Sequence, residues 1–239
     1  MDELVRGFAE GQISRRVFIR RLVTAGVAMS GAVAFADLIQ ADPAAAMEYH
    51  YVDVADYAFS PVKATLSGPG DYVVWDWSGG PHSITVDATD GGLFDSSPIA
   101  SGGSVYPSWN WVTAFGWEMW AAGTFPYLCK DQYHTIDLAA PMNGKVRVPV
   151  RLSARSGRTG KDISVEFGSR SLDIDSKFRY EVQLRKPGRS WRDWVTDGMT
   201  PSRNYRARTV GKHQFRARLR NNGVGSTSGW SPVATFTAK

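Results

Sequence analysis

The sequence predicts an all-β protein in which an N-terminal signal helix is followed by two β-sandwiches. Apolar and polar residues alternate with a period of two in residues 178–184 and again in 215–220, the pattern of strands with one buried face. The only cysteine, Cys129, is followed closely by a histidine and a methionine, and a second histidine lies far upstream. A sandwich of antiparallel strands can bring such residues together. With 239 residues, 43% of them hydrophobic, the chain can form more than one core.

Residues 1–46 are expected to be an export leader. Arg15 and Arg16 are followed by Phe18, then by an apolar stretch at 22–36 and by three alanines at 44–46. This order is typical of the twin-arginine signal, with cleavage after Ala46. Cleavage at 34–36, retention as an anchor and an amphipathic basic helix are the alternatives. We therefore expect export to the periplasm, the cell envelope or the medium.

Residues 47–148 contain four side chains that are expected to bind one metal ion. They are His82, Cys129, His134 and Met142. A thiolate, two imidazoles and a weakly bound thioether form the trigonal site that accepts both Cu(I) and Cu(II) with little movement of the ligands. The sequence therefore predicts one type 1 copper ion. The alternative is that Cys129 is a small buried hydrophobic residue. Met142 is the least constrained of the four, because seven residues separate it from His134.

The segments that flank these ligands form a series along the chain. They read YAFSP at 57–61, GDYVVWDW at 70–77, GPHS at 80–83, LFDS at 93–96, GTFPYLC at 123–129 and MNGKVRV at 142–148. In order and spacing, the series resembles the plastocyanin and halocyanin branch of the cupredoxin family, over about residues 49–148. The stretch 107–120 is longer than its counterpart in that family, and its register is left open.

The resemblance implies a Greek-key β-sandwich and gives roles to single residues. The backbone N–H of Ser83 is expected to approach the sulfur of Cys129, and Met142 is expected to tune the redox potential from the axial position. His134 is the expected exit for electrons, with Ala140 and Pro141 beside it. Such a protein would exchange electrons with a redox partner protein.

Residues 149–239 are expected to form the second sandwich. Residues 155–160 read as a loop, 191–194 as part of the middle strands, and the run SGWSP at 228–232 follows the alternating segment 215–220. This half resembles a fibronectin type III module, with His213 near the position of a corner tyrosine and Phe167 near that of a tryptophan. His50 and His213 are expected on ordinary strand surfaces and not at a metal.

The arginines of this second half are expected to have a structural role first. Arg216, Arg218 and Arg220 occupy alternate positions of one strand, so they share a face and can stack on Trp191 or Trp230. This interpretation is favoured over a ligand site.

Charge separates the two halves of the chain. Residues 47–148 hold 4 Lys+Arg against 11 Asp+Glu, a difference of −7, and residues 149–239 hold 19 against 7, a difference of +12. Such asymmetry indicates a charged partner, with an anionic cell-envelope polymer or the acidic half itself as candidates. Nucleic acid is not expected, because no RNA-binding motif or recognition helix is visible.

These features predict an exported electron-transfer protein whose basic second half docks it, and not an enzyme. A trinuclear copper cluster is excluded because the four histidines form no His-x-His pair, and four protein ligands leave no open position for a substrate. Two other functions are compatible with the sequence. One is a surface-binding or adhesion protein with a structural or metal-free first sandwich, and the other is copper storage or delivery.

Overall fold

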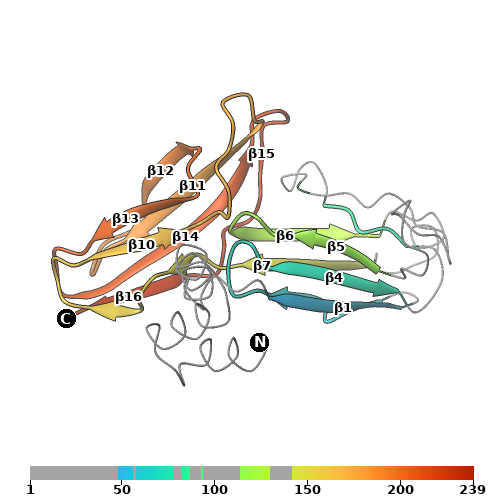
Figure 1. Ribbon diagram of the computed structural model, residues 1–239, viewed down its shortest axis with the longest axis horizontal. Helices are drawn as coiled ribbons and strands as arrows, with labels where there is room; N and C mark the ends of the chain where they lie inside the picture. The colour runs from blue at the N-terminus through green and yellow to red at the C-terminus, as the bar shows by residue number, and fades with distance from the viewer. Residues whose placement is uncertain (1–47, 56–57, 78–81, 87–92, 94–113, 130–141) are drawn as a thin grey trace, which may run out of the picture. The chain divides into compact units, whose positions relative to one another are not determined.

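The computed structural model describes residues 48–55, 58–77, 82–86, 93, 114–129 and 142–239 (Figure 1). The chain divides into Met1–Ala46 and a compact unit, Met47–Lys239. The described residues are all-β and include no helix, as predicted. In this part of the chain, therefore, no helix has the length and apolar character needed to cross a membrane. The predicted signal residues Arg15 and Arg16 lie outside the described residues.

The first half contains two sheets. One has the order β2-β1-β4-β5 and the other the order β3-β7-β6. Their strands are β1 (Tyr49–Ala55), β2 (Ala58–Ser60), β3 (Lys63–Thr65), β4 (Tyr72–Trp77), β5 (Ala114–Glu118), β6 (Gly123–Leu128) and β7 (Asn143–Val148). β5 falls in the stretch whose register the sequence left open, and it pairs antiparallel with β4.

Two strand pairs of the first half are parallel, which the sequence pattern did not indicate. β1 runs parallel to β4, and β3 runs parallel to β7. Between β1 and β4 the chain enters the other sheet as β3, so it returns to the first sheet in its original direction. A parallel pair needs such a crossover connection, which a tight hairpin cannot provide.

Alternating burial explains how the two sheets face each other. The side chains of Phe125 and Tyr127 in β6 are buried, whereas the alternate residues Thr124, Pro126 and Leu128 are partly exposed. The Tyr127 ring meets Trp75 of β4 edge-on at 5.4 Å and Phe59 of β2 at 4.9 Å. Edge-to-face pairs of this kind stabilise a core beyond the area that they bury.

The second half also contains two sheets, with the orders β13-β10-β8 and β12-β11-β14-β16-β9. Their strands are β8 (Arg151–Leu152), β9 (Ser156–Gly157), β10 (Asp162–Glu166), β11 (Phe178–Arg185), β12 (Arg192–Gly198), β13 (Ser202–Arg206), β14 (Gly211–Asn221), β15 (Ser226–Thr227) and β16 (Ala234–Ala238). This half is a second β-sandwich, as predicted. The loop expected at 155–160 is partly wrong, because β9 pairs with the end of β16.

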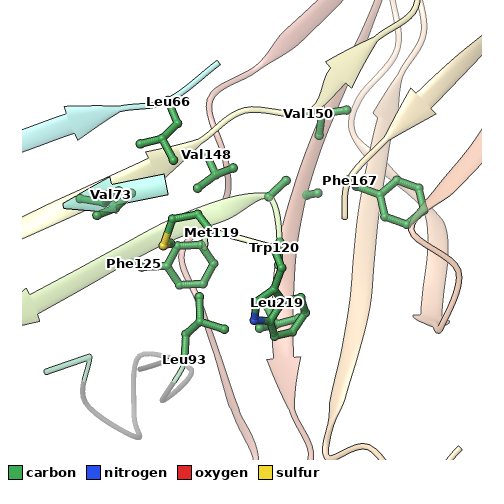
Figure 2. Close-up of a cluster of buried hydrophobic side chains, with 14 of the residues drawn as sticks. Leu66, Val73, Leu93, Met119, Trp120, Phe125, Val148, Val150, Phe167 and Leu219 are labelled. Carbon is green, nitrogen blue, oxygen red and sulfur yellow. The ribbon is translucent and has the colours of Figure 1, made fainter. Parts of the chain in front are cut away.

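The two halves share a continuous core that the sequence did not predict. β7 ends at Val148, β8 begins at Arg151, and Val150 between them is buried. The indole of Trp120 lies 5.5 Å from the ring of Phe178 and 6.1 Å from the ring of Tyr180. Figure 2 shows buried side chains of both halves in one cluster.

Polar contacts reinforce this junction. Thr124 of β6 exchanges two backbone hydrogen bonds with Gly229, at 2.8 and 2.9 Å. The Arg151 guanidinium lies 3.4 Å from the buried carboxylate of Asp71 and 3.5 Å from that of Glu166. The first half is thus held to the second by backbone pairing, an aromatic contact and an ionic link.

Candidate metal centre

The pairing of β6 with β7 fixes the position of Cys129. Cys129 directly follows β6 and continues its buried face after Phe125 and Tyr127. Its backbone N–H donates a hydrogen bond of 3.1 Å to the carbonyl oxygen of Met142, the residue before β7. The antiparallel ladder therefore places two of the predicted ligand residues opposite each other.

A separate backbone bridge brings His82 to the same place. Leu128 and Thr85 exchange backbone hydrogen bonds of 3.0 and 3.1 Å, so the segment 82–85 lies along the end of β6. His82 and Ser83 are both fully buried. Residues 46 or 47 positions apart in sequence thus meet beside one sulfur atom.

The contacts of the Cys129 sulfur define the centre. The backbone N–H of Ser83 donates to Sγ at 3.3 Å, and Nδ1 of His82 lies 4.0 Å from Sγ. An N–H donor to a ligand atom is the kind of outer contact that orients and tunes a metal site. Cys129 and Met142 are 1% and 3% exposed, so water is largely excluded.

These distances fit a shared metal ion. Metal–sulfur and metal–nitrogen bonds of about 2.3 and 2.0 Å at a trigonal angle separate the two ligand atoms by roughly 3.8 Å. The observed 4.0 Å between Sγ and Nδ1 is close to that value and long for a hydrogen bond. A thiolate with a thioether is a soft donor set that suits copper. His134, Ala140 and Pro141 lie outside the described residues.

The surroundings of the centre are aromatic and dry. Burial raises the pKa of Tyr127, two residues before Cys129, to about 12. Gly144 of β7 lies opposite Tyr127, and a Cβ atom at Gly144 would come within 2.4 Å of the tyrosine ring. The absence of a side chain at Gly144 is therefore needed for the ring to pack over the strand that leads to Cys129.

A second group with metal-binding side chains has another explanation. Glu48, His50 and Asp71 offer ligand atoms within 4.8 Å of one another, a juxtaposition that the sequence did not reveal. One carboxylate oxygen of Asp71 accepts N–H bonds of 2.9 Å from Ser67 and from Gly68, and the other faces Arg151. The Asp71 carboxylate is committed to the junction of the two halves, so this group is structural.

The expectation that His213 lies on a strand surface is wrong. His213 is fully buried, with Nε2 2.8 Å from the carbonyl oxygen of Thr209 and Nδ1 2.7 Å from the hydroxyl oxygen of Tyr205. A carbonyl accepts only, so Nε2 donates to Thr209, and Nδ1 has the Tyr205 hydroxyl as its partner. β14 turns this side chain inward, where its ring lies beside those of Tyr205 and Phe236. His50, by contrast, keeps a quarter of its side chain exposed on β1.

The predicted stacking of arginine on tryptophan is confirmed for two of the three arginines. The Arg216 guanidinium lies 4.5 Å from the Trp191 ring and 4.6 Å from the Trp230 ring, and Arg218 lies 4.5 Å from Trp230. Arg220 departs from the pattern and contacts Glu181 and Asp197. We call this group, with Arg185 on Trp191, the arginine–tryptophan ladder.

Comparisons with known proteins assign no family to this chain. No protein-family model and no curated protein matches the chain. Among solved structures, it is similar to the fibronectin type III domain of human fibronectin type III domain containing protein 3, at 17% identity and a TM-score of 0.28 over 38% of this chain and 83% of that one.

Two further solved structures are similar at the same level. An Fn3-like protein from Clostridium thermocellum has 14% identity and a TM-score of 0.24, over 39% of this chain and 94% of that one. A multicopper oxidase has 12% identity and a TM-score of 0.27, over 81% and 89%. Scores in this range assign no family, and the fold of the chain rests on its own strand order.

Proposed function

We propose that this chain is an exported type 1 copper protein that transfers single electrons, with its fibronectin type III-like half as a docking module. The observation that carries the proposal is the environment of Cys129. Its sulfur lies 3.3 Å from a backbone N–H donor and 4.0 Å from an imidazole nitrogen, in a buried position between two sheets. His134 and Met142 would complete the cupredoxin ligand set.

The chain's own residues would keep the ligands still during electron transfer. Bound copper would supply the one-electron couple between Cu(I) and Cu(II). The ladder between β6 and β7 holds Cys129 opposite Met142, and the bridge from Leu128 to Thr85 holds the His82 segment. The Ser83 N–H stabilises negative charge on sulfur, and such hydrogen bonds tune a metal site. Ligands that move little suit fast electron transfer.

The leader supports export of the protein, and the set of four ligands supports a protein as its electron-transfer partner. Arg15 and Arg16, with the apolar stretch behind them, support export by the twin-arginine route to the periplasm, the envelope or the medium. Electrons would pass to a redox partner protein and not to a bound substrate, because four protein ligands fill the coordination positions.

Titration of the full chain with Cu(II), followed by visible absorption and electron paramagnetic resonance, tests the proposal. We expect an intense thiolate-to-copper band that saturates at one copper per chain and is lost in Cys129→Ser. Ser83→Ala is the matched control, because Ser83 acts through its backbone N–H and should keep the band. A wild-type protein without the band would refute the copper site.

Electrochemistry separates electron transfer from copper storage or delivery. A reversible voltammetric wave with the copper retained over many cycles is expected for an electron carrier. Rapid loss of copper to a chelator, together with slow electron exchange, would instead favour storage or delivery.

A further inference from the structure

We propose that one end of the second half is a binding surface for a linear polymer that carries phosphate or carboxylate groups. The surface consists of six exposed cations on three turns and at the start of β14: Arg158, Lys161, Lys186, Arg189, Arg208 and Lys212. We call it the basic turn surface. The inference deepens the docking part of the proposed function by naming the site and the chemical class of its ligand.

Hydrogen bonding and packing hold the three turns side by side. The turn between β9 and β10 joins the end of β13, because the Gly160 N–H donates to the carbonyl oxygen of Ala207 at 2.8 Å. The turn between β13 and β14 touches the turn between β11 and β12. There, a Cβ atom at Gly211 would lie 2.9 Å from Pro187. The six cations therefore gather at a single end of the sandwich.

The charge of this surface is not neutralised within the described part of the protein. None of the six side chains forms an ion pair or a side-chain hydrogen bond with another described residue. Asp162 and Asp193 are the acidic residues beside these turns. Arg206 already binds both oxygens of Asp162, at 2.9 and 2.5 Å, and Asp193 accepts a hydrogen bond of 2.9 Å from Gln183. The six positive charges thus remain available to a ligand.

The ladder arginines differ in this respect, although they belong to the same half. Arg216 donates two hydrogen bonds to Gln183, of 3.0 and 2.7 Å, and Arg218 donates one of 2.7 Å to Glu181. Their guanidinium groups are also covered by indole rings. The cations of this half therefore form two groups. Those of the arginine–tryptophan ladder have side-chain partners within the protein, and those of the basic turn surface have none among the described residues.

The composition of the turns favours a soluble polyanion over a lipid membrane. The large apolar side chains in these turns are Val210, which is 67% exposed, and Trp191, which is partly buried against the guanidinium groups of Arg185 and Arg216. Apart from the cations, the remaining residues are mostly glycine, serine, threonine and proline. Surfaces that insert into lipid usually present Trp, Phe or Leu beside their cations. Cations without such anchors attract repeated negative charges in a manner that salt screens.

The position of the surface is compatible with electron transfer. β14 runs from the turns at Gly211 to Asn221, roughly 30 Å along the strand. The neighbouring residues Phe178 and Ser228 lie at the junction with the first half. From there β6 leads away to Cys129. A polymer bound at the turns would therefore leave the candidate metal centre uncovered.

Binding of the full chain to polyphosphate and to polyglutamate, measured by calorimetry at low and high salt, tests the inference. Two variants lose the same charge. The first is Lys161→Gln, Arg208→Gln and Lys212→Gln on the basic turn surface, and the second is Lys63→Gln, Lys145→Gln and Lys177→Gln at exposed positions elsewhere. We expect the first variant to weaken binding about tenfold or more, and the second to change it less than about threefold.

Each other outcome contradicts the inference. Equal weakening in both variants would assign binding to net charge, and the absence of wild-type binding to either polymer would remove the ligand class. Stronger binding to vesicles of anionic lipid than to polymer would make the surface a membrane contact. The two polymers distinguish phosphate from carboxylate recognition. Polymer binding needs no copper, so loss of the visible band with polymer binding intact would refute the copper proposal alone.

Discussion

His82 in the first half and His213 in the second are both fully buried, yet their ring nitrogens have different neighbours. Both nitrogens of His213 lie within 2.8 Å of an oxygen that holds the ring in place. Nδ1 of His82 lies 4.0 Å from a thiol sulfur, a separation typical of two ligands on one ion. Burial of a histidine therefore does not make it a candidate metal ligand, and the two histidines differ in the type and distance of the neighbouring atoms.

Substitution of each histidine by glutamine should give the largest difference between the two regions, in the copper band and in the unfolding free energy. We expect His82→Gln to abolish the visible copper band and to leave the unfolding free energy of the metal-free protein within about 1 kcal/mol of wild type. We expect His213→Gln to keep the band and to lose about 2 kcal/mol, because the hydroxyl of Tyr205 and the carbonyl of Thr209 lose well-placed partners. Absorption and urea unfolding measure the two effects.

A different result for His213→Gln would contradict the structural role of His213. Loss of the band in His213→Gln with a normal midpoint would mean that the hydrogen-bonded histidine reaches the metal. Tyr205→Phe is the control for the second region. It removes the same hydrogen bond without touching the imidazole and should destabilise the protein without affecting the band.

Trp120→Ala should have the next largest effect, because it tests whether the two regions fold as one unit. Trp120 is 3% exposed and is covered by Phe178, Tyr180 and the guanidinium of Arg170. Removal of a buried tryptophan costs about 3–5 kcal/mol. We expect the unfolding curve to shift and to split into two transitions. A curve that keeps one transition and its midpoint would show that the junction adds little stability.

Glycine-to-alanine substitutions should cause a smaller loss of stability at two positions, one in each half, where a glycine lies against a tyrosine ring. A Cβ at Gly144 would meet the Tyr127 ring at 2.4 Å, and one at Gly168 would come near the Tyr180 hydroxyl. Each should cost about 1–3 kcal/mol by forcing a packed ring to move. Only Gly144→Ala should shift the copper band, because Tyr127 precedes Cys129 on the same strand face. Equal band shifts in both variants would remove this distinction.

The smallest expected effect is a loss of folding stability at alkaline pH that depends on Tyr180. Burial raises the pKa of Tyr180, so the folded protein keeps a phenol proton that the unfolded chain releases above about pH 10. Stability should therefore fall as the pH rises above 10, with about 1 kcal/mol of the loss at pH 11 due to this residue. Tyr180→Phe should flatten the decline when urea midpoints are compared between pH 9 and 11. An unchanged slope would assign the decline to other groups.

Sequence patterns predicted the strands better than their partners. The alternating runs at 178–184 and 215–220 became β11 and β14, and the segment that ends in Cys129 became β6. Alternation indicates that one face of a strand is buried, but it does not indicate which strand lies beside it or in which direction that strand runs. The parallel pairs and the short strand β9 were therefore missed. No local signal marked Trp120 as a junction residue.

The sequence by itself determined the all-β class, the opposite charges of the two halves and the types of donor atom that are available, because these follow from composition and short-range periodicity. Only the tertiary structure decided which of these residues meet. It set the 4.0 Å between His82 and Cys129, the burial of His213 and the separation of paired ladder arginines from unpaired turn cations. Each of these depends on strands far apart in sequence pairing in one register, which no local pattern encodes.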